Sequence, residues 1–450
     1  MLRTLRCSPG PALSILPLVV GLLLSISIAS CDRSPVSTMA PVRQTSSTAV
    51  AGRGQVADDL RDREVVVTLA PGVDPATIAS KYDAVLVKDG ADPTAASLAP
   101  APGETQAELQ LSLASDPGVL TAEPNSWLET AESRQQSFAF DDGFGSAATF
   151  EEQPAADAIH LNAAHEVALG QGVKVAILDT GVDARHTLLW SAYAGGIDLV
   201  SGDNDPTERR DFKDNDGDGQ TDEAFGHGTH VAGIIHLVAP QAGLLIVRVL
   251  DDDGRGRLID IVAGVRWAVA NGAKVINLSL GSLEKSDALQ LALRDAKHSG
   301  VVVITSAGNW GNDKPEEYPA RSHYVAAIAA VDASAQPAKF SSYGDIVALS
   351  APGVGVRSTY PGGGYRLWSG TSMAAPFVAG TCALLAEIHP DWTLSQMLDR
   401  IEGTTGKVRG KSSSRASKFG AGILDAGAAL QPDLPSNIEP AMPEASTRPR

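Results

Sequence analysis

The fold is decided by the stretch Val173-Lys174-Val175-Ala176-Ile177-Leu178, which ends at the polar turn Asp179-Thr180-Gly181. A short, largely apolar run before a turn predicts a strand that is buried on both faces. Similar runs follow at residues 244–249, 275–279, 301–305 and 325–330, with helical patterns at 258–270 and 286–298. This alternation predicts an α/β fold with a mostly parallel sheet covered by helices on both faces. In such a sheet, the functional site lies at the carboxyl ends of the strands.

A smaller α/β unit is predicted upstream, in residues 60–125. Its strands are expected at residues 64–69, 84–87 and 118–121, and its helices at 75–82 and 104–114. Residues 126–155 contain Ser, Gly, acidic residues and isolated Phe without a period. We therefore expect them to form an exposed linker that is open to proteolysis. The large domain is expected over residues 156–430, followed by a polar, disordered tail over residues 431–450.

Composition and charge exclude some classes of partner and site. The 450 residues include 36 Lys and Arg against 53 Asp and Glu, which gives a net charge of −17. This is the wrong sign for binding a phosphate backbone, so nucleic acid is not an expected partner. The three cysteines are too few and too scattered for a disulfide framework or a cysteine metal site.

The amino terminus has the pattern of a secretory signal. Arg3 and Arg6 precede an uncharged apolar stretch that ends Ile28-Ala29-Ser30-Cys31. This ending resembles the bacterial lipobox, which implies a lipoprotein signal peptide over residues 1–30 and a lipid on Cys31. An ordinary cleaved signal and an uncleaved anchor are the alternatives. Residues 31–59 are rich in Ser, Thr, Pro and Ala, and predict a flexible tether.

Three motifs stand where the parallel-sheet rule places a functional site. They are Asp179-Thr180-Gly181 after the first strand, Gly226-His227-Gly228-Thr229-His230 at the start of a helix, and Gly370-Thr371-Ser372-Met373 at the start of another. A serine hydroxyl is a poor nucleophile until an imidazole takes its proton, and the imidazole needs a carboxylate on its other nitrogen. Ser372 is therefore the expected nucleophile, His227 the general base and acid, and Asp179 the orienting carboxylate. His230 lacks the spacing of a zinc motif and is expected to be structural.

In this order the motifs resemble the subtilase (subtilisin-like serine protease) family, over about residues 156–430. The resemblance implies an endopeptidase that cleaves extended polypeptides through an acyl-enzyme intermediate, without an organic cofactor. It also implies that Asn309 donates to the developing oxyanion. Two segments are implied to flank a substrate that binds as an added strand, through Gly254, Gly256, Ser279, Leu280 and Gly281.

The same resemblance places Trp310 and Glu317 at the pocket for the residue before the scissile bond. A partly buried carboxylate gains from a cationic partner, so Glu317 would favour Lys or Arg there. A solvated charge at the rim of the pocket is the alternative.

An acidic loop before His227 predicts a calcium site. Acidic or amide side chains stand at alternate positions of this loop, with a glycine at the sixth, as in calcium loops; they are Asp214, Asp216, Asp218, Gln220 and Asp222. Phe225 stands at the twelfth position, so this is not a complete EF-hand, and Asp222 or Glu223 would have to close the site. A bare acidic loop is the alternative. The usual calcium site of the family is expected to be absent, because Leu188 replaces an acidic ligand.

The unit at residues 60–125 resembles subtilase propeptides, which assist folding and block the cleft until they are cleaved. Self-processing within residues 126–153 would leave the lipid on the propeptide. The sequence thus predicts an exported zymogen, anchored in the cell envelope as a precursor and released as a periplasmic or extracellular enzyme. Its expected partners are polypeptide substrates, its own propeptide and, before maturation, the membrane. The alternative is a catalytically silent lipoprotein that binds peptides in the same groove.

Overall fold

A computed structural model describes residues 62–89, 94–132, 137, 139–313, 317–409, 415 and 417–431. The predicted signal peptide, Cys31, the predicted tether and residues 432–450 lie outside the described residues.

Seven parallel strands form the central sheet, in the order β13-β12-β11-β10-β6-β8-β7. Their bounds are β6 (Lys174–Asp179), β7 (Tyr193–Asp198), β8 (Gly243–Arg248), β10 (Val275–Leu278), β11 (Val302–Ser306), β12 (Ala326–Val331) and β13 (Val347–Pro352). The predicted fold class is thereby confirmed. The two strands that the sequence did not predict, β7 and β13, are the edges of the sheet, where one side of a strand has no partner and a continuous apolar run is not required.

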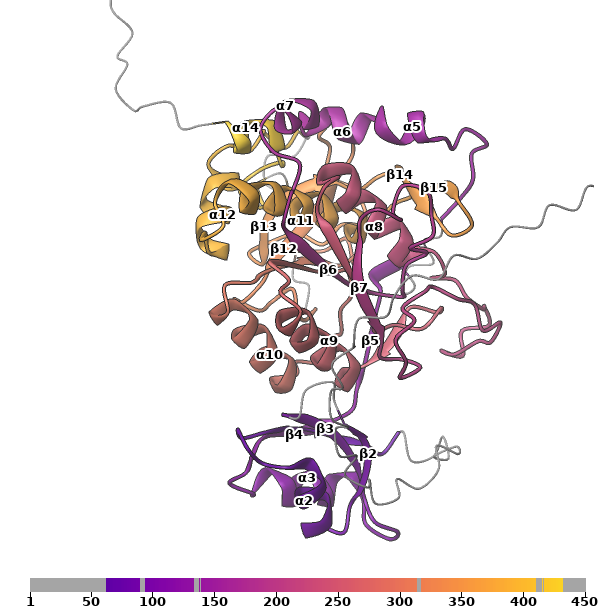
Figure 1. Ribbon diagram of the computed structural model, residues 1–450, viewed down its shortest axis with the longest axis vertical. Coiled ribbons are helices and arrows are strands. Elements are labelled where there is room, and N and C mark those ends of the chain that lie inside the picture. The colour runs from indigo at the N-terminus through magenta and orange to yellow at the C-terminus, as the bar shows by residue number, and fades with distance from the viewer. Residues whose placement is uncertain are drawn as a thin grey trace, which may run out of the picture. The chain divides into compact units, whose positions relative to one another are not determined.

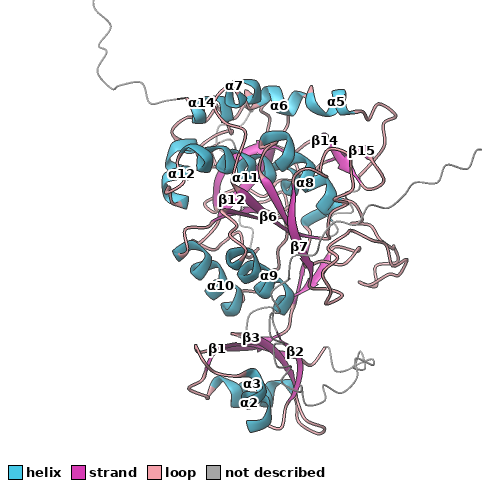
Figure 2. Cartoon of the chain, viewed as in Figure 1, coloured by secondary structure: helices cyan, strands magenta, loops and turns pink. Residues whose placement is uncertain are grey.

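Helices cover both faces of this sheet, because its strands are buried on both sides (Figures 1 and 2). In β6, Val175 and Ile177 pack with the helices α8 (His227–Val238) and α11 (Thr371–Ile388). Ala176 and Leu178, which point the other way, pack with α9 (Leu258–Ala270) and α10 (Asp287–His298). The shorter helices are α5 (Ala147–Glu151), α6 (Pro154–Ala158), α7 (Leu161–His165), α12 (Leu394–Glu402) and α14 (Ala426–Leu430). Among the described helices, α11 alone is long and apolar enough to cross a membrane, but 89% of it is buried as the core helix.

A second, antiparallel sheet forms the small unit, in the order β2-β3-β1-β4. Its elements are β1 (Val65–Leu69), α2 (Pro75–Lys81), β2 (Val85–Asp89), β3 (Ala95–Ala99), α3 (Gln106–Ala114) and β4 (Val119–Pro124). The sequence did not predict β3, because its Ala-Ala-Ser-Leu-Ala composition carries little strand propensity.

The small unit contacts the amino-terminal ends of α9 and α10. Glu123 Oε1 accepts a hydrogen bond from the Ala288 backbone N at 2.6 Å, and Asn125 Oδ1 accepts one from the Ile259 backbone N at 3.1 Å. The first backbone N–H groups of a helix have no partner within the helix, and the helix dipole favours negative charge there. Lys88 adds an ion pair with the buried Asp260.

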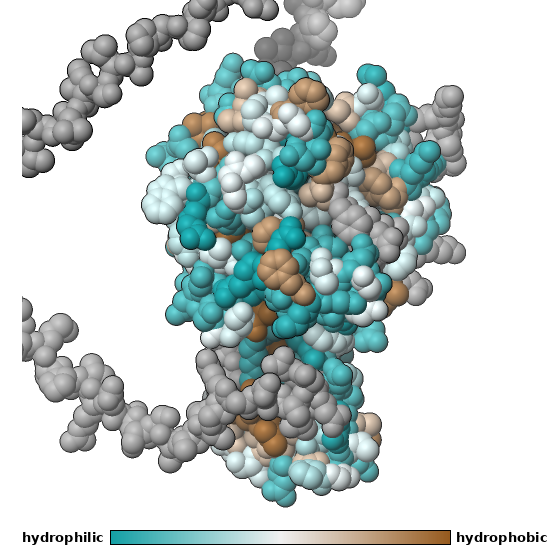
Figure 3. Space-filling view, turned by 90° about the vertical axis from the view of Figure 1, so that its right-hand side faces the viewer, coloured by the Kyte–Doolittle hydropathy of each residue, from teal (hydrophilic) through white to brown (hydrophobic). Residues whose placement is uncertain are grey.

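The segment after the small unit is exposed only in part, as at residues 143–149, and its first residues are not the exposed linker that the sequence predicts. Leu128, Thr130, Ala131 and Glu132 are each 3% exposed or less. They are buried because β5 (Trp127–Glu129) pairs antiparallel with β9 (Arg255–Arg257), a short strand at the carboxyl end of the large sheet. A hairpin of β14 (Val356–Tyr360) and β15 (Gly364–Trp368) lies near the same end. The face drawn in Figure 3 is mostly hydrophilic, with scattered small hydrophobic patches, in keeping with the acidic composition.

Candidate active site

Asp179 and His227 meet where β6 ends and α8 begins. His227 Nδ1 lies 2.7 Å from Asp179 Oδ1, and both side chains are at most 1% exposed. The Thr180 backbone N also donates to Asp179 Oδ1, at 2.8 Å. The carboxylate is thereby fixed, and it can hold the imidazole in one tautomer and one orientation.

Two glycines allow α8 to approach β6 this closely. A Cβ on Gly228 would stand 2.0 Å from the carbonyl oxygen of Gly181, so only a glycine fits there. Gly181 has a φ of 104°, in the left-handed region, and its own Cβ would meet the carbonyl oxygen of Pro206 at 2.7 Å. These glycines explain why the polar residues occur within Asp-Thr-Gly and His-Gly-Thr motifs.

Ser372 and Asn309 approach from the other side, on α11 and on the turn after β11. Asn309 Oδ1 accepts hydrogen bonds from the backbone N of Thr371 at 3.0 Å and from its Oγ1 at 2.9 Å. This pairing turns the Asn309 Nδ2 donor toward Ser372, whose backbone N is one of the free amides of the α11 amino terminus. The two donors can together bind one oxyanion.

A fourth side chain, Glu132, lies between these groups. Its Oε2 accepts from Ser372 Oγ at 2.5 Å and lies 3.3 Å from His227 Nε2. Its Oε1 accepts from Asn309 Nδ2 at 2.9 Å and from the Ser372 backbone N at 3.3 Å. Sequence reasoning missed Glu132, because it stands in a stretch with no motif and no period. The structure brings His227, Ser372 and Asn309 together around its carboxylate, with Asp179 at the other ring nitrogen of His227.

The two segments predicted to flank an extended peptide flank a strand of the chain itself. Glu129 exchanges two backbone hydrogen bonds with Gly281, at 2.9 and 2.8 Å, and Thr130 N donates to the Gly254 carbonyl oxygen at 2.9 Å. Leu128 pairs with Gly256 in the register of β5 and β9. Of the other predicted contacts, Leu280 is buried in the core, and Ser279 Oγ donates to the Ser372 carbonyl oxygen at 3.2 Å.

Glu317 is a buried side chain and not a solvated rim charge, since it is only 2% exposed. Trp310 Nε1 donates to its Oε2 at 3.2 Å. A Cβ on Gly308 would stand 1.8 Å from Oε2, and one on Gly281 would stand 2.4 Å from Oε1. The Glu317 carboxylate therefore lies against the backbone of Gly281, in one groove segment, and of Gly308, the residue before Asn309.

Glu208, which the sequence did not single out, ties the two motifs of β6 and α8 together. Its carboxylate is buried and accepts from the Thr180 and Thr229 hydroxyls and, at 2.8 Å, from the Gly226 backbone N. Burial raises the pKa of Glu208 to about 7, against the effect of these donors. His230, in contrast, is structural as predicted: its Nε2 contacts the carbonyl oxygens of Val356 and Arg366, and burial lowers its pKa to about 3.

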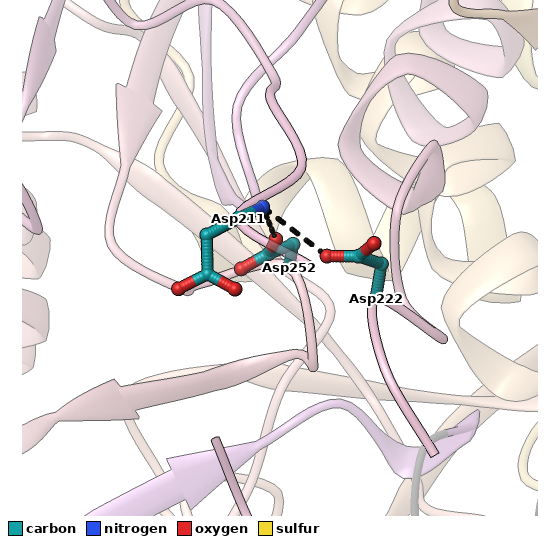
Figure 4. A group of neighbouring side chains, drawn as sticks. All are labelled: Asp211, Asp222 and Asp252. Atoms are coloured by element: carbon teal, nitrogen blue, oxygen red, sulfur yellow. Dashed lines mark hydrogen bonds between the residues drawn. The ribbon is translucent and has the colours of Figure 1, made fainter. Parts of the chain in front are cut away.

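Acidic residues in and beside the loop form three groups of carboxylates that could each hold a metal ion, and not the single site that the sequence predicts. The groups are Asp214 with Asp216 and Asp253, Asp216 with Asp218 and Glu223, and Asp211 with Asp222 and Asp252. Asp222 therefore belongs to a group apart from the loop, and Gln220 to none of the three, since its Nε2 donates to Asp218 Oδ2 at 3.0 Å. Figure 4 shows the third group, in which the Asp211 backbone N donates to both neighbouring carboxylates. The sequence signal that could have found the missing partners is the run Asp251-Asp252-Asp253 after β8.

This arrangement of a buried carboxylate, an imidazole, a hydroxyl on a helix amino terminus and two oxyanion donors defines a serine hydrolase type of site on an α/β sheet. The subtilase family model (Peptidase_S8) matches residues 170–422. The chain belongs to the subtilase family, and it is a serine endopeptidase.

Relatives agree with this assignment. The chain is 40% identical over 271 residues to a thermostable alkaline protease of Halalkalibacterium halodurans, covering 58% of this chain and 68% of that protein. It is 39% identical over 274 residues to subtilisin E of Bacillus subtilis, covering 58% and 66%. The crystal structure of fervidolysin from Fervidobacterium pennivorans, described as a keratinolytic enzyme related to subtilisin, is similar with a TM-score of 0.68 and 26% identity. This match covers 83% of this chain and 61% of that one.

Proposed function

We propose that the chain is the zymogen of an exported endopeptidase, which hydrolyses peptide bonds in extended polypeptide segments. Ser372 is the nucleophile, His227 the general base and acid, Asp179 the orienting carboxylate and Asn309 an oxyanion donor. The chain's own residues 127–130 carry this proposal, because they lie as an added strand between Gly256 and Gly281 and lead directly to Ser372. A groove that holds an extended polypeptide beside a nucleophile has the geometry that peptide-bond hydrolysis requires.

The chemistry follows from the positions of the side chains. With the groove free for substrate, His227 Nε2 takes the proton of Ser372 Oγ as the oxygen adds to the substrate carbonyl carbon. Asn309 Nδ2 and the Ser372 backbone N bind the oxyanion. The proton passes from His227 to the leaving amine, and water then hydrolyses the acyl-enzyme. Hydrolysis of an unfolded polypeptide by the processed protein, measured beside Ser372→Ala, tests the proposal.

The small unit acts as the propeptide, and the lipid on Cys31 anchors the precursor. The role of the small unit is supported by its contacts with the amino termini of α9 and α10, and by the strand β5, which joins the small unit to the groove. A cut in the segment after this strand separates Cys31 from the peptidase. The membrane then keeps the propeptide, while the enzyme is held only by non-covalent contacts.

Calcium is proposed as a structural ion of the acidic loop, centred on Asp216, which is shared by two of the three carboxylate groups. Both carboxylate oxygens of Glu223 are buried without a hydrogen-bond partner among the described residues. Burial, together with Asp253 beside it, raises the pKa of Glu223 to about 8. Hard oxygen donors with unrelieved negative charge fit Ca²⁺, which would connect the loop to the start of α8.

Removal of calcium is expected to lower the thermal unfolding midpoint of the processed enzyme. An ion at about a hundred times its dissociation constant adds roughly 2.7 kcal/mol, which corresponds to a shift of about 5–10 °C in a domain of this size. The measurement is a melt with excess Ca²⁺ and with chelator, for the wild type, Asp216→Asn and the control Asp391→Asn, an exposed loop residue. Only Asp216→Asn should lose the calcium response. A wild-type melt that is indifferent to the chelator contradicts the site.

Glu317 is expected to give the pocket a preference for Lys or Arg before the scissile bond. A buried carboxylate gains from a cationic partner, and Gln keeps the shape and the acceptor for Trp310 Nε1 while removing the charge. Glu317→Gln should lower kcat/KM for Lys and Arg peptides by at least about tenfold, or ~1.4 kcal/mol, relative to a matched Leu peptide. Equal cleavage of all three peptides by the wild type, unchanged in the variant, would rule out this role.

A further inference from the structure

The Glu132 carboxylate contacts the nucleophile, the base and both oxyanion donors of the site at once. Both oxyanion donors, Asn309 Nδ2 and the Ser372 backbone N, point at its Oε1. The hydroxyl of Ser372 donates to its Oε2 at 2.5 Å, and among the described residues it has no hydrogen bond with His227. The fit is close, since a Cβ on Gly370 would stand 1.7 Å from Oε1.

The charge of Glu132 also disables the base. His227 lies between two carboxylates, with Asp179 Oδ1 at Nδ1 and Glu132 Oε2 at Nε2. Burial alone would lower the pKa of His227, but the two carboxylates outweigh it and raise this pKa to about 10. An imidazolium cannot take the proton of Ser372. Nucleophile, base and oxyanion donors are thus all held by one side chain.

The backbone around Glu132 shows which peptide bond can take the place of this carboxylate. The chain is extended through Glu129 and becomes helical at Ala131 and Glu132. The Glu132 carbonyl oxygen already accepts from the Ser137 backbone N at 3.0 Å. Ser137 Oγ donates to the carbonyl oxygen of Ser369, three positions before Ser372, so the chain lies on both sides of the nucleophile. We therefore expect the peptide bond between Ala131 and Glu132, and not the one after Glu132, to enter the site when the helical turn at Ala131 becomes extended.

We propose that Glu132 is an internal plug of the oxyanion site, which keeps the precursor inactive, and that Ala131–Glu132 is the bond cut when the plug leaves. This inference rests on the proposed function. In the cut, Ser372 Oγ adds to the Ala131 carbonyl carbon as its proton passes to His227 Nε2. The carbon–nitrogen bond breaks, and the proton returns to the nitrogen of Glu132. Water hydrolyses the resulting ester, which leaves a carboxylate on Ala131 and a new amino terminus at Glu132.

The plug should weaken as the pH rises. Asp179 and Glu132 together raise the pKa of His227 to about 10, and Asp179, which stays in place when Glu132 leaves, contributes the larger part. Departure of Glu132 lowers this pKa, so the docked state loses its advantage as the pH rises through about 10. The groups that face His227 are Asp179 from the end of β6, Glu132, and His230 on α8, which stays neutral because burial lowers its pKa to about 3. Trp368 of β15, whose ring centroid lies 5.3 Å away, carries no charge.

The test is the rate at which a fluorophosphonate, which esterifies an active serine, labels Ser372 in the uncut precursor. Short pulses at several pH values, from neutral up to about 10, the pKa of His227 in the docked state, are read by intact mass, so that uncut and cut chains are counted separately. The variants are Glu132→Ala, which removes the plug, and Glu132→Asp, which keeps the charge but draws it back by about one carbon–carbon bond, ~1.5 Å. The control is Glu151→Gln, an exposed acid at the end of α5. The processed wild type serves as the reference for an open site.

The expected result is that uncut Glu132→Ala and Glu132→Asp are labelled at least about tenfold faster than the uncut wild type and the Glu151→Gln control at neutral pH, with the wild type catching up as the pH rises. Sequencing of the cut wild type should begin at Glu132. If all precursors are labelled at the rate of the processed enzyme, or if the cut lies elsewhere, the plug or its bond is overturned while the proposed function stands. If no form is labelled, including the processed one, the proposed function fails and the plug with it.

Discussion

Ser372→Ala is expected to lower the turnover of an unfolded polypeptide by roughly 10⁶-fold, the size of effect measured for this nucleophile in a subtilisin. The reason is that no other hydroxyl stands between the oxyanion donors and His227 in the described part of the chain. Binding should change little, because the groove contacts made by Gly254, Gly256 and Gly281 are to backbone. The measurement is kcat and KM for the processed wild type and for Ser372→Ala whose precursor has been cut by an added protease that is then removed. Intact mass follows the precursor.

The matched control is Ser350→Ala, which removes a buried hydroxyl from β13 that donates to the Phe419 carbonyl oxygen at 2.8 Å. It should process itself and turn over substrate as the wild type does, apart from a modest loss of stability. The Ser372→Ala precursor should stay at full mass under the same conditions. If the Ser372→Ala precursor is cut at the wild-type rate in the absence of other protease, self-processing is wrong. If the wild type neither cuts itself nor hydrolyses peptide, the silent peptide-binding lipoprotein becomes the better description.

Asn309→Ala should lower kcat by about 10²- to 10³-fold with KM nearly unchanged, because the donor acts on the oxyanion and not on the ground-state carbonyl. Alanine also leaves the Thr371 backbone N and hydroxyl without their acceptor, which costs stability. Asn309→Asp separates the two effects. It keeps an acceptor for Thr371 but has no N–H to donate, and its charge repels the oxyanion.

Both Asn309 variants should therefore lose turnover, while only Asn309→Ala should show the full drop in thermal midpoint. Measuring kcat, KM and the thermal midpoint for both variants separates the loss of oxyanion binding from the loss of stability. Wild-type turnover in Asn309→Asp would show that the backbone N of Ser372 suffices, and that the amide of Asn309 serves only to fix Thr371.

The sequence predicted the parallel sheet and the motifs around the site because both depend on local pattern. Buried strands such as β10 and β11 need continuous apolar residues, and the close packing of α8 on β6 needs glycine at positions 181 and 228. No local pattern of this kind marks Glu132 in the sequence. Its role depends on a strand pairing, between β5 and β9, across more than a hundred residues of chain.

The acidic groups show the same limit. Asp214, Asp216 and Asp218 stand in one loop and were found from their spacing. Glu223, which the sequence offered as a closing ligand, groups with Asp216 and Asp218. The partner Asp253 lies with Asp214 and Asp216 only because the segment after β8 meets the loop in space. A one-dimensional pattern cannot reveal a ligand that arrives from another strand.

The contacts of Glu123 and Asn125 with the starts of α10 and α9 have a consequence for how fast activity emerges. While the chain is whole, these contacts are intramolecular and do not depend on how much protein is present. After a cut, the two pieces are separate molecules, and the docked fraction follows their concentration and dissociation constant. At a high protein concentration, a lag should then precede full activity, and at a low protein concentration it should not. Dilution itself becomes the trigger that frees the enzyme.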